Sequence, residues 1–197
     1  AATVWLTGGM HEDGLSDVAD AFFGSASPER ALQIMKDPRV GNYAVLVLVL
    51  YLLTKIVLLA ALALLHWPAS LYLLVAAHVI SRFFPLLLAN RLPHVGLDGQ
   101  SKTRQVAGVI ANLRLAPAAL SCAPLIAGYW LPQGPRLLGI AALCALAAAM
   151  TARLMQAWFR RRLQGFTGDC LGATQQVCEL ACYATALTAA LHGALPA

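Results

Sequence analysis

Carboxylate side chains gather near the start of this 197-residue chain. Six of its nine Asp and Glu residues fall within the first 37 positions, and four of them lie in residues 11–20, His-Glu-Asp-Gly-Leu-Ser-Asp-Val-Ala-Asp. On a helix that turns about 100° per residue, Asp13, Asp17 and Asp20 project within roughly 60° of one another. Three negative charges on one face need a compensating cation, and carboxylate oxygens suit Mg²⁺, which usually also carries substrate phosphates. The spacing therefore predicts a Mg²⁺ site for a diphosphate substrate.

The alternative interpretation of this segment is a solvated helix start, where Asp and Glu interact favourably with the positive end of the helix dipole. Only three carboxylates, those of Asp98, Asp169 and Glu179, follow among the remaining 160 residues. Because acidic residues are scarce in this chain, their concentration in one segment favours a functional site.

The rest of the chain is strongly apolar. Hydrophobic residues make up 59% and charged residues 12% of the sequence, and the mean hydropathy is +0.68, values typical of proteins with several membrane spans. We expect an all-α, polytopic transmembrane helix bundle with about five spans, each long enough to cross about 30 Å of hydrocarbon. The expected spans are residues 43–65, 68–89, 106–130, 137–158 and 175–195.

The organisation that follows is a single integral membrane domain over residues 1–197. Residues 1–42 would form an acidic helix and a bend at the membrane interface, and residues 43–197 the transmembrane bundle. The chain starts without methionine and without a signal-peptide pattern. We therefore expect a fragment or processed product, in which residues 1–7 end a preceding span that is missing.

Lys and Arg counts predict the orientation, because short cytoplasmic loops are enriched in these residues. One side carries nine of them and the other only Arg136. The nine are Arg30, Lys36 and Arg39, then Arg91, Lys102 and Arg104, then Arg160, Arg161 and Arg162. The acidic segment is expected on their side, facing the cytoplasm. The formal charge of +5 follows mostly from this bias, so we expect a lipid bilayer and no nucleic acid as partner.

A bend precedes the first span. Pro38 disfavours helix at Asp37, and Gly41 permits a turn, so the bend presents Lys36 and Arg39 at the interface. These cations can hold phosphate oxygens of a substrate or anchor the chain to lipid headgroups. The sequence leaves both roles open.

Two further polar features lie in or beside the spans. Arg82 lies within the second span, with His78 four residues earlier on the same face. An ionisable group inside a span usually faces the bundle interior or a polar cavity, so Arg82 is a candidate phosphate ligand, with snorkelling to the headgroups as the alternative. A glycine-rich cytoplasmic loop is expected at residues 165–174, where Asp169 is either a helix N-cap or a metal ligand.

Three motifs, in one order and separated by apolar spans, closely resemble those of the bacterial cobalamin synthase family, the adenosylcobinamide-GDP ribazoletransferases. They are Gly-Gly-Met-His-Glu-Asp-Gly-Leu-Ser-Asp-Val-Ala-Asp at 8–20, Met-Lys-Asp-Pro-Arg-Val-Gly at 35–41 and Gly-Phe-Thr-Gly-Asp-Cys-Leu-Gly-Ala at 165–173. The resemblance covers nearly the whole chain. It implies a Mg²⁺-dependent, multi-pass enzyme of the bacterial cytoplasmic (inner) membrane that acts late in the synthesis of cobalamin, vitamin B12.

The reaction that the resemblance implies joins adenosylcobinamide-GDP to α-ribazole or its 5′-phosphate. A ribazole hydroxyl would attack the phosphorus on the cobinamide side and GMP would leave, so metal ions and cations would stabilise the charge that develops on the oxygens. The implied metal ligands are Asp13, Asp17 and Asp20, with Glu12 and Asp169 as further contributors.

The remaining roles follow in the same way from the resemblance. The groups implied to bind substrate phosphate are Lys36, Arg39, Arg82 and Gly168. A metal-bound alcohol needs little help to lose its proton, which leaves the general base open; the candidates are His11 and one of the aspartates Asp13, Asp17 and Asp20.

A CDP-alcohol phosphotransferase is the nearest enzymatic alternative, since it also binds metal through aspartates on membrane helices. Its pattern has Asp-Gly, two residues, Ala-Arg, and later aspartates at wider spacing. Here Asp13-Gly14 is followed by Asp17-Val18, and Asp20 comes too soon, so phospholipid synthesis is the weaker hypothesis.

A transporter subunit is the alternative from a different class, with Arg82, Arg114 and Glu179 lining a path through the membrane. The acidic cluster, however, lies at the cytoplasmic edge, where an enzyme meets soluble nucleotides. Small residues in 141–149 can pack within one chain or between chains, so a homo-oligomer stays open.

Overall fold

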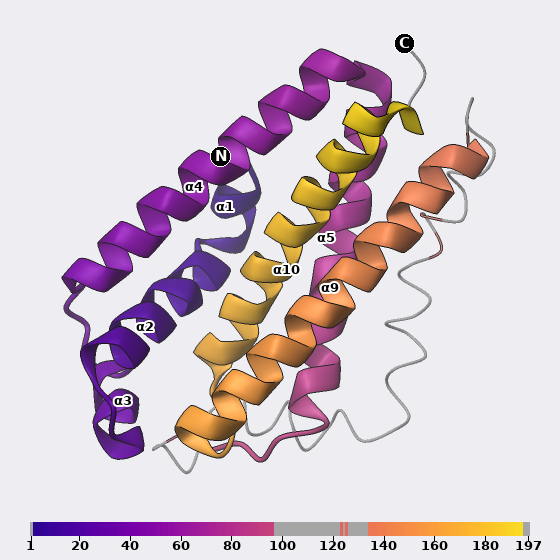
Figure 1. The fold of residues 1–197 in the computed structure, drawn as a ribbon. Coiled ribbons are helices and arrows are strands. Elements are labelled where there is room, and N and C mark those ends of the chain that lie inside the picture. Colours follow the sequence, from indigo (N-terminus) through magenta and orange to yellow (C-terminus); the bar gives the residue numbers. More distant parts are fainter. Residues whose placement is uncertain (1, 97–122, 124, 126–133, 195–197) are drawn as a thin grey trace.

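The computed structural model describes residues 2–96, 123, 125 and 134–194, and almost all regular structure in these ranges is helical (Figure 1). The shorter helices are α1 (Ala2–Thr7), α2 (Met10–Gly24) and α3 (Pro28–Ile34). The long helices are α4 (Asn42–Leu65), α5 (Trp67–Ala89), α9 (Gly134–Leu163) and α10 (Gly168–Ala189), which a π-helical turn, Ala190–Ala194, continues. The expected all-α bundle is confirmed.

Within the described ranges, four helices are long and apolar enough to cross a membrane: α4, α5, α9 and α10 with its π-helical turn. They coincide with four of the predicted spans, 43–65, 68–89, 137–158 and 175–195. The chain is thus a multi-pass membrane protein. The predicted span at 106–130 lies outside the described residues, apart from positions 123 and 125.

The predicted glycine-rich loop at 165–174 is wrong in extent, because α10 begins at Gly168. Thr167 is the N-cap: its side-chain oxygen accepts a hydrogen bond from the backbone N–H of Cys170 at 3.4 Å. Asp169, one alternative for the cap, is instead the second residue of the helix. Gly172 is a helical residue as well, and it serves close packing rather than a loop.

A tight connection joins α4 to α5. His66 ends α4, and its Nδ1 accepts a hydrogen bond from the backbone N–H of Ala69 at 3.1 Å, which caps α5. Pro68 lies in the first turn of α5. Backbone N–H groups there have no acceptor within the helix, so the N–H that proline lacks costs no helical hydrogen bond. The two spans therefore run antiparallel, side by side.

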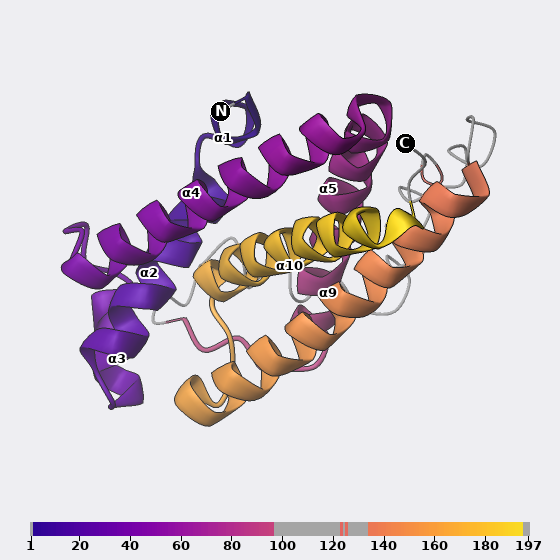
Figure 2. The same ribbon diagram turned by 45° about the horizontal axis from the view of Figure 1, so that its top comes forward.

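The helix α10 is central to the bundle and packs against α2, α4, α5 and α9 (Figures 1 and 2). One apolar core, which includes Ile80, Ala148 and Tyr183, joins α5, α9 and α10. A second core includes α2, where the Phe22 ring meets the Trp158 ring edge-on at 4.8 Å between centroids. These contacts pack one face of the acidic helix α2 against the bundle, while Asp13 on the same helix stays exposed.

The outer side of α4 is apolar and exposed. Leu53, Ile56 and Val57 on it are each more than half exposed. Exposed apolar side chains are more favourable in the hydrocarbon of a bilayer than in water, so we expect this side of α4 to contact lipid.

The ends of α2, α5 and α9 meet at one end of the bundle. After α5, the backbone N–H of Val95 donates to the carbonyl oxygen of Phe166, between α9 and α10, at 3.0 Å. Arg162, near the end of α9, donates to the carbonyl oxygen of Phe22 at 2.9 Å. The basic stretches after α5 and α9 therefore share one end of the bundle, in agreement with the charge count; residues 102–104 lie outside the part that the structure describes.

Candidate active site

The helices α2 and α10 touch at two glycines. A Cβ atom on Gly14 would lie 2.8 Å from the carbonyl oxygen of Asp169 and 3.0 Å from its Cα. A Cβ atom on Gly172 would lie 3.2 Å from the carbonyl oxygen of His11. Because no side chain separates the two backbones here, the first and third motifs of the sequence meet, and Asp169 joins the carboxylates of α2.

Asp13, Asp17 and Asp169 interact electrostatically at this crossing. Burial raises the pKa of the Asp17 carboxyl to about 7, and the negative charges of Asp13, Asp169 and, last, Asp20 act in the same direction. Asp17 therefore holds a proton up to neutral pH when no cation is present. Neighbouring carboxylates repel one another when they are ionised, and a bound cation would offset this repulsion.

The donor set fits Mg²⁺ as an open site. All the donors are carboxylate oxygens, which Mg²⁺ prefers. Within the described ranges, no three His, Cys, Asp or Glu side chains are grouped closely enough to hold a metal ion by themselves. Mg²⁺ is commonly bound through one or two carboxylates and completes its shell with water and substrate phosphates. These residues suit an ion that arrives with a diphosphate better than a permanent structural ion.

Asp20 has a structural partner in addition to its predicted role as a metal ligand. Its Oδ2 accepts a hydrogen bond from the backbone N–H of Gly41 at 2.6 Å, and its Oδ1 accepts one from Ala44 at 2.9 Å. These N–H groups belong to the start of α4, where no helical acceptor is available to them. Asp20 thereby fixes α2 to α4, and its metal role stays a prediction.

We expect Asp20→Ala to lower the free energy of unfolding by about 1–2 kcal/mol, because the start of α4 loses its side-chain acceptor. Thermal unfolding in detergent measures this, with Glu29→Ala, at an exposed carboxylate of α3, as the control. An Asp20→Ala protein that binds Mg²⁺ poorly but unfolds like its parent would contradict the capping role.

Glu12 lies on a different face of α2 from Asp17, about 140° away by helix geometry. Its side chain is buried, and among the described residues its Oε2 has no hydrogen-bond partner. Its charge acts on His11 and Tyr51. Glu12 therefore faces the bundle interior, and its role as a metal ligand stays a prediction.

His11 begins the acidic motif in the first turn of α2. Burial lowers the pKa of its imidazole, and the positive charge of Arg82 lowers it further. His11 is consequently neutral at pH 7 and able to accept a proton, as a general base must.

Three of the predicted phosphate-binding groups lie around the crossing of α2 and α10. Arg82 is exposed, and its charge reaches His11 on α2. The charge of Lys36 acts on Asp169. Gly168 is the first residue of α10, where free backbone N–H groups favour anions. The charges of Arg82 and Lys36 thus reach residues at the crossing, and their roles as phosphate ligands stay predictions.

Arg39, the fourth predicted phosphate ligand, is engaged by its neighbour Asp37. Its Nε donates to Oδ1 of Asp37 at 2.8 Å, and its Nη2 lies 2.5 Å from Oδ2. Hydrogen bonds from Arg39 lower the pKa of the Asp37 carboxyl to about 2. Arg39 would have to leave this pair in order to bind a substrate phosphate.

Glu179, which is only 1% exposed in the middle of α10, is not among the predicted site residues. Its Oε1 lies 2.7 Å from Nζ of Lys55 on α4 and 3.4 Å from Nδ1 of His78 on α5. A signal was present in the sequence: Gln175, Glu179 and Tyr183 recur every four residues in an otherwise apolar span, which places three polar side chains on one face.

Comparisons with known proteins agree with the three motifs. A family model described as cobalamin-5-phosphate synthase matches residues 1–187. The adenosylcobinamide-GDP ribazoletransferase of Polaromonas naphthalenivorans is 47% identical over 92% of this chain and 69% of that protein. The protein of the same name from Albidiferax ferrireducens is 46% identical over 93% of this chain and 69% of its own length. One from Vibrio cholerae is 37% identical over 95% of this chain and 68% of its own length.

No solved structure matches the chain, so the arrangement of α2 against α10 has no solved counterpart among these comparisons. The family model extends over all three motifs and over the four described spans up to residue 187. This chain matches more than two thirds of the length of relatives that are 37–47% identical to it. Together these matches show that the chain belongs to the cobalamin-5-phosphate synthase family.

Proposed function

We propose that the carboxylates at the crossing of α2 and α10 carry out the phosphoryl transfer of an adenosylcobinamide-GDP ribazoletransferase. Family membership makes the chain a transferase of cobalamin synthesis. The observation that supports this site is the mutual electrostatic effect of Asp13, Asp17 and Asp169, brought together from both ends of the chain. The substrates would be adenosylcobinamide-GDP and α-ribazole or its 5′-phosphate.

The reaction exchanges one phosphorus–oxygen bond for another. A ribazole hydroxyl oxygen bonds to the phosphorus on the cobinamide side of the diphosphate, and the bond from that phosphorus to the bridging oxygen breaks. GMP leaves with the bridging oxygen. The hydroxyl proton goes to a base, for which neutral His11 is available in the first turn of α2.

Each group around the crossing has a separate task. A Mg²⁺ ion held by one or two of the carboxylates of Asp13, Asp17 and Asp169, and by the diphosphate itself, would neutralise negative charge on that diphosphate. Lys36 and Arg82 bind phosphate oxygens that the carboxylates would otherwise repel, and the start of α10 at Gly168 offers backbone N–H donors.

The site would face the cytoplasm from the bacterial inner membrane. The basic stretches after α5 and α9 lie at the same end of the bundle as the end of α2, and such stretches are enriched on the cytoplasmic side. Soluble guanine nucleotide and ribazole meet the site from that side, and the bilayer surrounds the apolar faces of α4 and α9.

The test measures GMP and corrinoid product from the protein reconstituted in lipid vesicles, with adenosylcobinamide-GDP and α-ribazole 5′-phosphate. We expect both products in equal amounts with Mg²⁺ and neither with EDTA. Equal turnover in EDTA would refute the metal site, and absence of product with Mg²⁺ would refute the transferase assignment. A parallel reaction with a CDP-activated alcohol distinguishes the phospholipid alternative.

The affinity for Mg²⁺ should depend on pH through Asp17. Because its pKa is raised to about 7, the proton competes with the metal below neutrality and is already lost above it. The affinity for Mg²⁺ should therefore fall about tenfold from pH 8 to pH 6. Calorimetric titration with Mg²⁺ at both pH values measures this, and Asp17→Asn should remove the pH dependence. Equal affinities at the two pH values would contradict the prediction.

A further inference from the structure

A buried polar network joins α4, α5 and α10 in the interior of the bundle. Both carboxylate oxygens of Glu179 accept hydrogen bonds: Oε1 from Tyr183 at 2.9 Å and Oε2 from Gln175 at 2.8 Å. The Oε1 atom also lies 2.7 Å from Nζ of Lys55 and 3.4 Å from Nδ1 of His78. Glu179 is thus held by side chains from three different helices.

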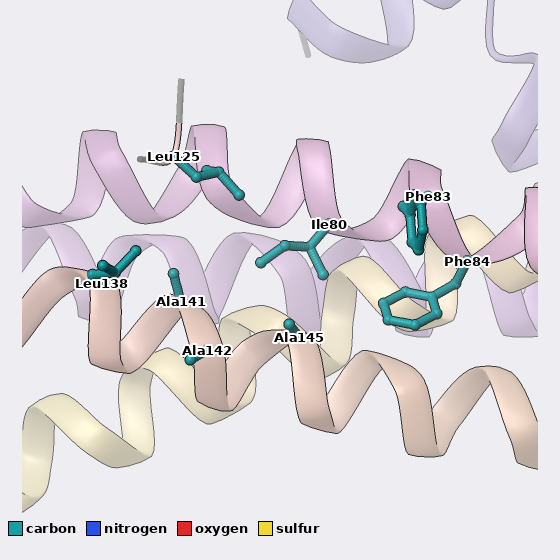
Figure 3. Close-up of a pocket in the computed structure, with 8 residues that line it drawn as sticks. All are labelled: Ile80, Phe83, Phe84, Leu125, Leu138, Ala141, Ala142 and Ala145. Carbon is teal, nitrogen blue, oxygen red and sulfur yellow. The ribbon is translucent and has the colours of Figure 1, made fainter. Parts of the chain in front are cut away.

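Such a network is expensive within a membrane span, where ionisable groups are rare and usually serve a function. A buried ion pair is also often no more stabilising than apolar packing of the same volume. Elsewhere the same spans pack through apolar side chains alone. Between α5 and α9, a pocket is lined by residues such as Ile80, Phe84 and Leu138 (Figure 3). Packing of the spans alone therefore does not account for the charges of Lys55 and Glu179.

The network continues toward the candidate active site through His78. The Nδ1 atom of His78 that faces Glu179 also lies 3.1 Å from Nη1 of Arg82, but one ring nitrogen either donates or accepts, so it bonds to one of these partners at a time. When Nδ1–H donates to Glu179, the guanidinium lies beside the ring, and its Nη1 is held by the carbonyl oxygen of His78 at 3.0 Å. Among the described residues, Arg82 forms no ion pair with a carboxylate. Its charge is felt by His11 at the start of the acidic motif. Arg82 is the outer end of the network and is available to a phosphate.

A second branch reaches the interior side of α2. Nζ of Lys55 donates to the hydroxyl oxygen of Tyr51 at 3.1 Å, and the Tyr51 hydroxyl donates to the side-chain oxygen of Gln176. The charge of Glu12 on α2 acts on Tyr51. The two branches of the network therefore interact electrostatically with His11 and Glu12, both in the first turn of α2.

We propose that Glu179 is a positioning residue that fixes His78 and, through it, directs Arg82 toward the substrate diphosphate. The positive charge of Lys55 balances the negative charge of the buried Glu179 carboxylate. Glu179 can therefore stay ionised as the partner of His78. Without Glu179, the imidazole of His78 is free to turn, and the guanidinium of Arg82 keeps its bond to the carbonyl oxygen of His78 but loses the ring that lies beside it. The inference rests on the proposed function, which has Arg82 as a phosphate ligand.

The test compares Glu179→Gln, Arg82→Gln and the double variant, with adenosylcobinamide-GDP and unphosphorylated α-ribazole as substrates. We expect each single variant to raise KM for adenosylcobinamide-GDP about tenfold, the size of one lost charge-assisted hydrogen bond. KM for α-ribazole, which carries no phosphate, should not change. The double variant should be no worse than Arg82→Gln alone, because both changes remove the same interaction.

Two further variants separate positioning from general damage. Cys178→Ala removes a buried side chain of α10 that contacts the carbonyl oxygen of Ala148 on α9, outside the network; it should lower the melting temperature without raising KM. Tyr183→Phe removes one donor to Glu179 at little risk to the fold, and it should raise KM for adenosylcobinamide-GDP severalfold. It keeps the test decisive if Glu179→Gln does not fold.

The outcomes separate this inference from the proposed function. Full additivity of Glu179→Gln and Arg82→Gln, or an equal rise in KM for both substrates, would overturn the positioning role while leaving the transferase intact. Parent-like kinetics of Arg82→Gln would remove Arg82 from phosphate binding and this inference with it. A parent protein that makes no product would overturn the proposed transferase, and equal turnover of the parent in EDTA would overturn its metal site.

Discussion

Asp17→Asn should reduce turnover by about 10³-fold or more while the protein remains folded in the membrane. The charges of Asp13 and Asp169 both act on Asp17, so its carboxylate is central to the proposed Mg²⁺ site. An amide keeps the shape but cannot supply the negative charge that a divalent ion needs, and metal stabilisation of the transferred phosphoryl group is a large part of such catalysis. GMP release by the reconstituted variant measures the loss.

Stability should change in the opposite direction from turnover. The raised pKa means that ionised Asp17 is less stable in the folded protein than in the unfolded chain. Without metal, the parent should therefore lose stability as pH rises from about 4, the unfolded pKa, through about 7. Asp17→Asn lacks this loss, so in EDTA at pH 8 it should melt at the same temperature as the parent or higher.

The matched control is Glu29→Gln, which removes an exposed carboxylate of α3 outside the crossing. It should leave turnover close to that of the parent. Near-parent turnover by Asp17→Asn would remove this residue from the mechanism, and a sharp drop in its melting temperature would show that the carboxylate serves the fold.

The acidic motif could be predicted from sequence because its geometry is local. Three aspartates at positions 13, 17 and 20 share a helix face whatever the rest of the chain does. Their partners depend on tertiary contacts that no local spacing encodes. Asp169 reaches the motif through the contact of Gly14 with α10, and Asp20 finds the start of α4. The sequence could therefore name the ligand types but not which carboxylates meet.

The misplaced loop has a related physical origin. Glycine permits unusual backbone conformations, and it also permits close contact between helices. Gly172 serves the second purpose, but a cluster of glycines gives the same signal for both. Glu179 and Lys55 were likewise visible as isolated charges in apolar spans, yet only the folded bundle shows that they pair.

The second large effect is expected from Gly14→Ala. The added methyl group would lie 2.8 Å from the carbonyl oxygen of Asp169 and 3.0 Å from its Cα, and backbone atoms cannot turn aside as a side chain can. The helices must separate, which should cost about 1–3 kcal/mol of unfolding free energy. Thermal unfolding in detergent measures the loss.

Gly139→Ala on α9 is the matched control, since an added methyl group there meets nothing within 4 Å. It should be neutral or stabilising by up to about 1 kcal/mol, because alanine favours the helix. The same destabilisation in both variants would show that the contact of Gly14 with Asp169 is not what matters.

Turnover should fall further in Gly14→Ala than its stability explains. Separation of α2 from α10 moves Asp169 away from Asp13 and Asp17, so the cluster that raises the pKa of Asp17 loosens. Two readouts should therefore change together in the folded fraction: Mg²⁺ should bind more weakly, and the pH dependence of its binding should shift to lower pH. If the folded variant binds Mg²⁺ like its parent at every pH, the distance between α2 and α10 does not control the site, and Asp169 contributes nothing that Asp13 and Asp17 do not already supply.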